Sequence, residues 1–403
     1  MAGFITRIRK AIWHRVDPSD KGKVWRIMRH PPEVRDDEIV FTSSDDFTGN
    51  PKALFLYMIE HGYNERYKIT WLFERKENCF DFGIPNVSSA VIWNDKGGRT
   101  PAAQMAAMRA KYIFYSHNVH WVRNFRPEQN FIDLWHGCGY KDEMKSDERT
   151  IYYDYLIVTG SKYIDIFKRV LRDPEGNVLD LGYPRNEFLF SERSLARKLL
   201  AELKEKRNAD KAVIWMPTYR KSVFARLDSD TAKGATGLPV VYEESDLAEL
   251  DAFCRKEGVL LVLKQHFLQQ DYSASDNGLT NILFIDEKYL REHDADLYEL
   301  MGATDALMTD YSSVAIDYML LDKPIGYTLD DFDEYDNARG FSFEGVKEYM
   351  PGHHIYTMED LERFIDDVAA GIDPYKEHRN EIRPEMQTYT DGFSKRILDY
   401  FGI

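Results

Sequence analysis

The sequence alternates between short apolar runs and helical patterns along most of its length. The helical patterns are about 10–15 residues long, which is the spacing of β-α-β units, whose parallel strands are covered by helices on both faces. Because 403 residues exceed what one ordinary core accommodates, the alternation predicts two α/β domains. The apolar runs that indicate strands are residues 68–73, 90–93, 112–115, 131–134, 156–159, 212–216, 259–264, 282–285, 306–308 and 324–327.

A proline turn at residues 181–184 and a highly charged helical pattern at residues 191–206 separate two such alternations. We therefore expect two Rossmann-like domains, an N-terminal one at residues 31–190 and a C-terminal one at residues 191–403, after a leader of residues 1–30. In sheets of this kind, ligands bind beyond the carboxyl ends of the strands or between domains. Candidate functional residues are therefore those that directly follow the apolar runs.

The charge of the chain is unevenly distributed. Residues 1–30 contain eight lysines and arginines and two acidic residues, a charge of +6, so residues 31–403 carry −21 of a total of −15. Such an acidic body repels nucleic acid, so we expect neither DNA nor RNA as a partner. The leader also has apolar residues at roughly helical spacing, which predicts a basic amphipathic helix on an anionic membrane surface. The alternative is a solvated or packed terminal helix.

The sequence also predicts where the protein works. No apolar run reaches 18 residues, and basic residues interrupt the N-terminus, so we expect neither a membrane span nor a secretory signal. The cysteines Cys79, Cys138 and Cys254 are scattered, without CxxC spacing, which argues against disulfides and zinc and for a reducing cytoplasm. The expected location is therefore peripheral, at the cytoplasmic face of the membrane.

Residues 306–323 form the most informative single segment. A short apolar run ends in Thr309 and Asp310, and Ser312 and Ser313 then open a helical pattern. A turn from a buried strand into a helix leaves backbone N–H groups unpaired above the strand end, and two hydroxyls add further donors. This combination suits a phosphate or a pyrophosphate. The alternative is an ordinary turn in which Ser312 only caps the helix.

His136 follows the apolar run 131–134 and precedes Gly137, with Lys141 and Lys145 close behind. A histidine at the carboxyl end of a strand faces the crevice, and its ordinary pKa lies near working pH. It is therefore a candidate general base that removes a proton from an attacking hydroxyl. The alternative is a hydrogen-bonded histidine of the core.

Lys264 and His266 form a second candidate, at the end of the run 259–264. Because alternate residues of a strand share a face, the two side chains lie on the same side beyond the sheet edge. A lysine and a histidine there suit an anionic leaving group. The alternative is a pair of side chains that face solvent.

Arginines follow proline turns at two further strand ends, as Arg185 and, after Thr218, as Arg220. The planar guanidinium binds phosphate oxygens in pairs, so both are candidate phosphate ligands, with surface ion pairs as the alternative. Residues 334–341 read as a polar loop in which Arg339 closes over a ligand.

The chain lacks a Walker loop, a GxGxxG turn after a strand and a GxSxG elbow. His353-His354 and Asp330-Asp331 have no metal-ligand spacing, and we interpret them as loop residues. The sequence therefore predicts no cofactor and no metal site, and it leaves a requirement for a divalent metal ion open.

Taken together, these segments resemble the CDP-glycerol glycerophosphotransferase family of teichoic-acid primases and polymerases, over roughly residues 38–400. The combination of Trp-His-Gly and Thr-Asp-Tyr-Ser-Ser is the most specific part. The matching segments are residues 48–54, 69–72, 134–137, 182–186, 216–220, 264–266, 308–318, 333–335, 339–341 and 351–352. The chain departs from the family pattern at Glu187, where the family often has aspartate, and at Phe267, where proline is frequent.

The resemblance implies an α/β, GT-B-like fold in which two Rossmann-like domains with parallel sheets face a central cleft. Residues 31–190 would then bind the acceptor and residues 191–403 the CDP-polyol donor. The family's two functional histidines map onto His136 and His266, and its pyrophosphate-binding serines onto Ser312 and Ser313. The further donor-binding residues that we expect are Asp310, Lys264, Arg185, Thr218, Arg220 and Arg339.

The implied reaction transfers a polyol phosphate, most simply glycerol phosphate, from a CDP-alcohol to an acceptor hydroxyl and releases CMP. The acceptor would be a lipid-linked saccharide or a polyol-phosphate polymer, in the synthesis of teichoic acid or a capsule-type cell-surface polymer. Two alternatives are a GT-B glycosyltransferase that uses a nucleotide-sugar and a non-catalytic nucleotide-binding adaptor at the membrane face. The sequence does not distinguish glycerol from ribitol or primase from polymerase, and it does not give the oligomeric state.

Overall fold

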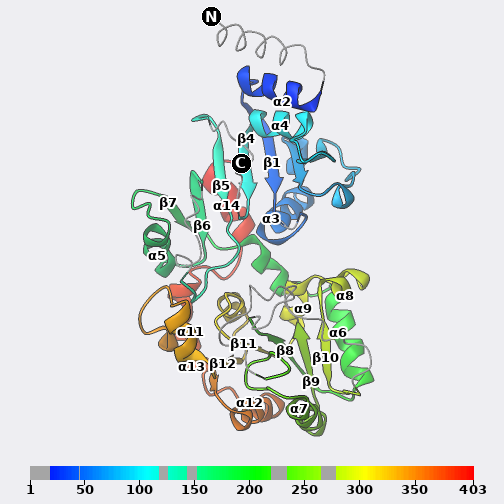
Figure 1. Ribbon diagram of the computed structural model, residues 1–403, viewed down its shortest axis with the longest axis vertical. Helices are drawn as coiled ribbons and strands as arrows, with labels where there is room; N and C mark the ends of the chain where they lie inside the picture. Colours follow the sequence, from blue (N-terminus) through cyan, green and yellow to red (C-terminus); the bar gives the residue numbers. More distant parts are fainter. Residues whose placement is uncertain (1–18, 45, 118–125, 143–151, 219–233, 265–277) are drawn as a thin grey trace, which may run out of the picture.

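The computed structural model describes residues 19–44, 46–117, 126–142, 152–218, 234–264 and 278–403. These residues form two α/β lobes, each built on a parallel sheet, and Figure 1 shows the lobe with β1 above the lobe with β8. Most of the predicted basic leader, residues 1–18, lies outside the described residues. Its remaining part forms helix α2 (Asp20–Arg29), capped by the Ser19 side chain and packed against α4.

The N-terminal lobe contains a seven-stranded sheet in the order β3-β2-β1-β4-β5-β6-β7, with every strand parallel to its neighbours. Its interior is apolar and rich in aromatic side chains, among them Trp71 and Phe114. The strands are β1 (Arg35–Thr42), β2 (Lys68–Phe73), β3 (Val87–Val91), β4 (Ala110–Tyr115), β5 (Asn130–Asp133), β6 (Tyr155–Val158) and β7 (Asn177–Asp180), and the helices that follow them are α3 (Gly49–Glu60), α4 (Pro101–Arg109) and α5 (Lys162–Val170).

The C-terminal lobe contains a six-stranded parallel sheet in the order β10-β9-β8-β11-β12-β13. All six residues of β9 are buried, as expected for a strand covered on both faces. The strands are β8 (Lys211–Met216), β9 (Val259–Lys264), β10 (Ile282–Ile285), β11 (Ala306–Thr309), β12 (Ile325–Thr328) and β13 (His353–Ile355), and the helices are α6 (Leu195–Lys206), α7 (Glu244–Lys256), α8 (Glu287–Glu292), α9 (Leu297–Ala303), α10 (Val314–Tyr318), α11 (Phe332–Ala338), α12 (Met358–Ala370) and α13 (Lys376–Met386).

Capping residues set the ends of several helices. The Thr100 hydroxyl accepts a hydrogen bond from the Ala103 N–H, so Thr100 caps α4, which begins at Pro101. The α6 helix begins later than the predicted residue 191, because the Ser194 side chain caps it by accepting from the Arg197 N–H.

Two predicted loops are regular elements. Residues 334–341 were predicted to be a polar loop, but Phe332–Ala338 is helix α11, because Phe332 and Tyr335 anchor it against the buried ring of Tyr311. His353 and His354 were also interpreted as loop residues, but they lie in β13, which pairs with β12. The polar residues at these positions show no helix or strand pattern in the sequence, because tertiary contacts hold both elements in place.

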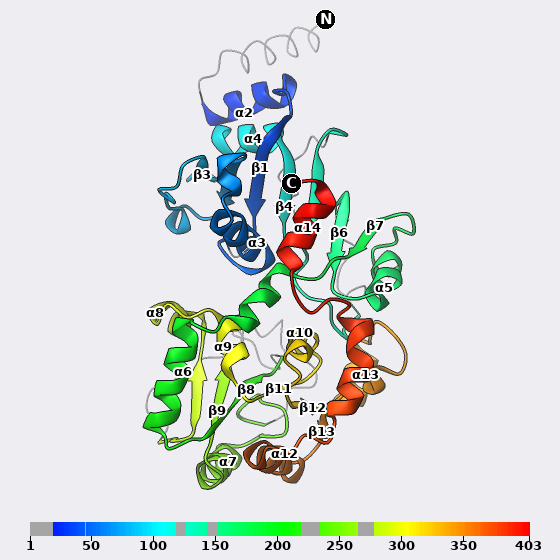
Figure 2. The same ribbon diagram turned by 180° about the vertical axis from the view of Figure 1, so that it is seen from behind.

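The chain crosses between the lobes twice. After η4 (Pro184–Phe190) it enters the C-terminal lobe at α6, and it returns after α13 to end in α14 (Phe393–Phe401). Figure 2 shows α14 beside the sheet of the N-terminal lobe, where the Tyr112 hydroxyl donates to the Phe401 carbonyl at 3.2 Å. The sequence assigned all of residues 191–403 to the second domain, whereas the last helix packs on the first lobe.

The strand orders place a switch point in each sheet. The order reverses between β1 and β4 in the first sheet and between β8 and β11 in the second. Crevices open beyond the carboxyl ends of strands at such points. The segments that follow these strands are therefore the ones that meet between the lobes.

Candidate active site

His136 lies in the loop after β5, and the residue before it has an unusual backbone conformation. Trp135 has a φ of 51°, in the left-handed region, and its N–H donates to the buried carboxylate of Asp133 at 2.8 Å. The Asn50 side chain, at the start of α3, donates to the carbonyls of Leu134 and Trp135 at 2.9 and 3.0 Å. These bonds hold the loop in a conformation that is rare for a bulky residue.

His136 is partly buried. Its ring is stacked on that of His117, with centroids 4.4 Å apart and planes 14° from parallel. Its Nδ1 is buried and has no hydrogen-bond partner among the described residues. Burial above all, and then the neighbouring His117 and Arg185, lower the pKa of His136 to about 3. The ring is therefore neutral at physiological pH, and the same burial makes it a weaker base than an exposed histidine.

His117 is a site residue that the sequence did not single out. It directly follows Ser116 after β4, at the edge where His136 follows β5, and its Nδ1 lies 3.1 Å from the Ser44 hydroxyl. A signal was present, because a histidine shortly after the apolar run 112–115 occupies the same kind of position as His136.

The predicted serine turn follows β11, next to the end of β8. Asp310 is fully buried, and its carboxylate accepts from the N–H and the hydroxyl of Thr218 at 2.7 and 2.5 Å. The ammonium of Lys141, from the loop of the other lobe, donates to the same Thr218 hydroxyl at 3.0 Å. Asp310 and Thr218 thus hold the two strand ends together, and Lys141 brings a positive charge to them.

Ser313, not Ser312, is the N-cap of α10, and its side chain makes no capping hydrogen bond. Neither serine hydroxyl has a hydrogen-bond partner among the described residues, so capping does not occupy them. The alternative in which Ser312 only caps the helix is therefore wrong.

The loop that carries His136 and the turn that carries Ser312 and Ser313 are in direct contact across the lobes. A Cβ added at Gly137 would overlap the Ser313 hydroxyl and lie 2.8 Å from Ser313 Cβ, and one added at Gly139 would lie 3.1 Å from Ser313 Cβ. Only glycine allows the backbone to approach this closely. His136 and Ser313 therefore belong to one site, although 177 positions separate them in the sequence.

Arg185 lies inside this site, with its side chain 11% exposed. Its guanidinium donates to the His136 carbonyl at 2.9 Å and to the Asp317 carboxylate at 2.7 Å. The predicted direct contact between Arg185 and a donor stays a prediction, because the structure shows these groups engaged with the protein itself.

The remaining predicted residues are less central or lie outside the described residues. The Lys264 ammonium, 8% exposed at the end of β9, pairs with the Glu287 carboxylate at 2.9 Å. Arg339 is exposed just after α11. No described contact joins either residue to the His136 and Ser313 group. Arg220 and His266, together with Lys145, lie outside the described residues.

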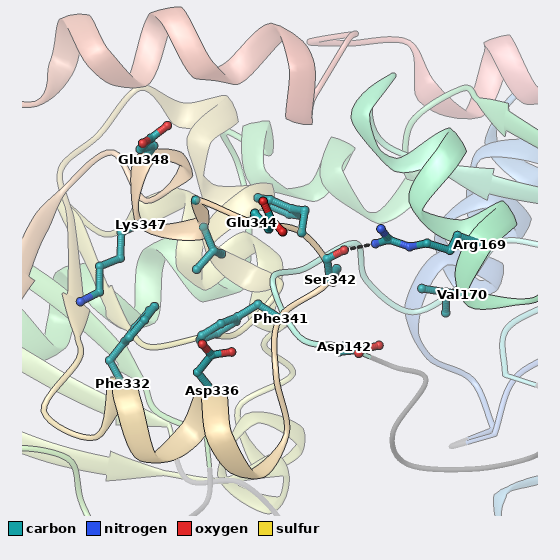
Figure 3. A pocket seen from close by; sticks show the side chains of 13 residues that line it. Asp142, Arg169, Val170, Phe332, Asp336, Phe341, Ser342, Glu344, Lys347 and Glu348 are labelled. Atoms are coloured by element: carbon teal, nitrogen blue, oxygen red, sulfur yellow. Dashed lines mark hydrogen bonds between the residues drawn. The ribbon is translucent and has the colours of Figure 1, made fainter.

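A cavity of about 800 Å³ lies between the lobes (Figure 3). Arg169 and Val170 of α5 form one wall, and residues 332–348 form much of the rest. The Arg169 guanidinium donates to the Ser342 carbonyl across it, and the Ser342 N–H donates to the Tyr140 carbonyl at 2.8 Å. The loop that begins at His136 therefore continues into the wall of this cavity, although none of the predicted site residues lines it.

Two features are absent from the described residues. No group of three or more histidine, cysteine, aspartate or glutamate side chains there is arranged to hold a metal ion. In the same part of the chain, no helix has the length and apolar character needed to cross a bilayer.

The two facing lobes define a GT-B protein, as the sequence predicted. The solved structure of the wall teichoic acid polymerase TagF matches 99% of this chain and 97% of its own, with a TM-score of 0.71 and 22% identity, which shows the shared fold. A solved UDP-N-acetylglucosamine 2-epimerase has a more distant likeness, with a TM-score of 0.51, 12% identity and coverage of 92% of this chain and 97% of its own.

The chain belongs to the CDP-glycerol:poly(glycerophosphate) glycerophosphotransferase family, whose model matches residues 24–401, so the predicted family is confirmed. It is 25% identical over 395 residues to the teichoic acid poly(glycerol phosphate) polymerase of Staphylococcus epidermidis, covering 90% of this chain and 48% of the relative. It is also 25% identical over 376 residues to the teichoic acid glycerol-phosphate primase of Bacillus subtilis, covering 87% and 88%. The chain therefore spans about half the length of the first relative.

A third relative is named for a different polyol. The teichoic acid ribitol-phosphate primase of Bacillus spizizenii is 25% identical over 300 residues, covering 69% of this chain and 70% of the relative. The chain is therefore equally similar in sequence to relatives named for glycerol phosphate and for ribitol phosphate.

Proposed function

We propose that this protein transfers a polyol phosphate, glycerol phosphate first, from a CDP-alcohol to an acceptor hydroxyl in the synthesis of a teichoic-acid or capsule-type cell-surface polymer. The observation that carries the proposal is the packing of the His136 loop of one lobe against the Ser312–Ser313 turn of the other. This packing supports the proposal because it brings the loop of the neutral His136 imidazole close to two hydroxyls that have no hydrogen-bond partner among the described residues. Family membership supplies the CDP-polyol as the donor class.

In the proposed reaction, His136 takes the proton of the acceptor hydroxyl as its oxygen attacks the β-phosphorus of the donor, which bears the polyol. One phosphorus–oxygen bond forms and the bond to the bridging oxygen breaks, so CMP leaves with the electron pair of that bond. The depressed pKa of His136 keeps the imidazole in the base form throughout the working pH range. Phosphoryl transfer depends mainly on positioning and charge stabilisation, so a weak but well-placed base is sufficient.

The serine turn would bind the diphosphate of the donor. The hydroxyls of Ser312 and Ser313 would donate to its oxygens, with Lys264, His266, Arg220 and Arg339 as further donor ligands. Lys141 adds a positive charge at Thr218, next to the strand end that carries the serines. These groups would take up the charge that develops on CMP as it leaves.

The second candidate is a GT-B glycosyltransferase that uses a nucleotide-sugar. Its supporting observation is the fold itself, which the chain shares with a UDP-N-acetylglucosamine 2-epimerase at a TM-score of 0.51. A non-catalytic adaptor is the third candidate, and it would need the serine turn but no base at His136. One solved structure that shares the fold is of a TagF variant soaked with CDPG, which favours the first candidate.

The test is a screen of donors with the purified protein. CDP-glycerol, CDP-ribitol and two UDP-sugars are each incubated with a lipid-linked saccharide and with a short polyol-phosphate polymer, and the products are identified by mass. We expect an acceptor heavier by one or more polyol phosphates, with one CMP released for each unit transferred. His136→Ala should lower turnover by about 100-fold to 10,000-fold, the usual contribution of a general base.

Each alternative has its own result in the same screen. Transfer of a sugar from a UDP-sugar would establish the glycosyltransferase. Binding of a CDP-polyol without release of CMP in any mixture would favour the adaptor, and wild-type turnover in His136→Ala would remove His136 from the mechanism.

The protein would work at the cytoplasmic face of the membrane, held there by its basic N-terminal segment. The described part of that segment supports this location, since Lys21, Lys23 and Arg29 of α2 are exposed. Clusters of basic residues bind anionic membrane surfaces.

A further inference from the structure

Asp317 is a buried carboxylate that is not among the site residues predicted from the sequence. It lies on α10, one turn after Ser313, and is 1% exposed. Its carboxylate accepts hydrogen bonds from four side chains that come from three separate segments of the chain. The donors are Tyr298 at 2.6 Å, Arg185 at 2.7 Å, Asn186 at 3.2 Å and Gln387 at 3.4 Å.

Arg185 joins Asp317 to the loop that carries the base. One terminal nitrogen of its guanidinium donates to Asp317 and the other donates to the His136 carbonyl at 2.9 Å. Its backbone N–H donates to Asn50, whose side chain also holds the carbonyls of Leu134 and Trp135. A continuous set of hydrogen bonds therefore runs from the helix that follows the paired serines to the backbone of the base.

We propose that Asp317 is a positioning residue, which fixes the separation between the His136 imidazole and the Ser312–Ser313 hydroxyls through Arg185. The inference rests on the proposed function, because it gives these two groups their roles. Asp317 itself touches neither group, so it acts through the arginine and through the helix on which it lies.

The energetics of buried ion pairs support a geometric role over a purely stabilising one. Removing two charges from water offsets much of their mutual attraction, so a buried pair adds little net stability, whereas its directional bonds specify one arrangement. The His136 loop and the serine turn have little room to shift relative to each other, because Gly137 and Gly139 pack against Ser313. A misplacement of roughly 1 Å between reacting groups lowers rates by about 100-fold.

The chain contains a matched control for this pair. Arg379 is fully buried and pairs with Asp373 at 2.5 Å, in the same lobe and with the same chemistry. Neither residue has a described contact with the His136 loop or the serine turn. Asp317→Asn and Asp373→Asn thus each remove one carboxylate from a buried arginine, but Arg379 keeps a second carboxylate, Asp322, at 3.1 Å. Only the first variant lies at the site.

The experiment compares these two variants with the wild type. We expect Asp317→Asn to lower kcat for transfer from a CDP-polyol by about 10-fold to 100-fold, with the KM of the donor changed by less than about threefold. Asp373→Asn should also lower the melting temperature, by a smaller amount because Arg379 keeps Asp322, and it should leave kcat unchanged. Tyr298→Phe removes one of the four bonds and keeps the ring under Arg185, so it serves as a milder variant if Asp317→Asn does not fold.

A second measurement is independent of turnover. The imidazole resonances of His136, assigned by their loss in His136→Gln, should shift in Asp317→Asn and stay in place in Asp373→Asn. Unchanged resonances and wild-type kcat in Asp317→Asn would overturn the inference, as would an equal loss of kcat in both variants. A wild-type protein that is inactive with every CDP-polyol would contradict the proposed function instead, and the resonances would still decide the positioning role.

Discussion

Individual residues at the ends of strands were predictable from the sequence, but their mutual contacts were not. His136 and Ser312–Ser313 each follow an apolar run, and the structure places both at the carboxyl edges of their sheets. The close packing of Gly137 on Ser313 depends on how two lobes meet, and no local pattern encodes that. The same holds for Arg185, whose pattern suggested a phosphate ligand and whose guanidinium bonds to Asp317 and to the His136 carbonyl.

The depressed pKa of His136 predicts a pH profile without the usual histidine limb. The base must be neutral to act, and burial lowers its pKa from 6.5 to about 3. We therefore expect kcat/KM for the transfer to stay constant from pH 8 down to about pH 5. A decline centred near pH 6.5 that reports on a single group would contradict this assignment.

The same pKa predicts a dependence of stability on pH. Between pH 6.5 and about 3, the unfolded chain binds one more proton at His136 than the folded chain does. Unfolding therefore becomes easier as the pH falls through this window, by up to about 1.4 kcal/mol per pH unit. Denaturant titrations of the wild type and of His136→Gln at pH 7, 6 and 5 isolate this contribution, since the variant should show the shallower loss.

At the scale of elements, prediction succeeded where an apolar run was bounded by polar residues. The run 259–264 is β9 and the run 282–285 is β10, each at the predicted limits. It failed where burial comes from a partner distant in sequence. The first three residues of β1 are polar and exposed and the next five are buried, so the strand shows no alternation. One face of α14 is buried because the helix returns to the first lobe.

The return of α14 predicts that its buried face stabilises the N-terminal lobe. Ile397 is fully buried, whereas Tyr400 on the same helix is 52% exposed. Ile397→Ala should lower the free energy of unfolding by about 2–5 kcal/mol, the usual effect of a truncation in a core, and Tyr400→Ala by about 1 kcal/mol or less. Denaturant unfolding measures both values.

Hydrogen exchange locates the effect of Ile397→Ala. The backbone amides of β4 and β6 should exchange faster in this variant, because α14 packs beside these strands through Tyr112, Phe114 and Tyr155. Faster exchange in the C-terminal lobe alone would contradict the packing of α14 on the N-terminal lobe.

At the scale of the whole molecule, alternation and length predicted two lobes, but the connections between the lobes could not be predicted. Lys52 of α3 pairs with Asp296 at 3.1 Å across the lobes, and residues 140–142 pair with residues 340–342. These contacts join segments about 200 or more positions apart. Only the assembled fold shows that the loop after His136 is held by both lobes.

The uneven charge of the molecule predicts binding to anionic membranes through its N-terminal end. Lys21 and Lys23 of α2 are exposed, and each basic residue near such a surface contributes about 1 kcal/mol. The acidic remainder of the chain is repelled by the same surface, so we expect binding only when the N-terminal end of the protein faces the membrane. We expect the wild type to sediment with vesicles rich in phosphatidylserine at low salt, and to be released as salt rises and the charges are screened.

A matched pair of variants separates this orientation from total charge. Lys21→Glu/Lys23→Glu and Lys198→Glu/Lys256→Glu both change the net charge from −15 to −19, but the second pair lies at exposed positions of the other lobe. The first pair should lower the fraction bound to anionic vesicles at least tenfold, since two contributions of about 1 kcal/mol reverse sign, while the second leaves it within about twofold. Equal loss in both variants would mean that net charge alone governs binding, and the N-terminal segment would then have no part in holding the protein at the membrane.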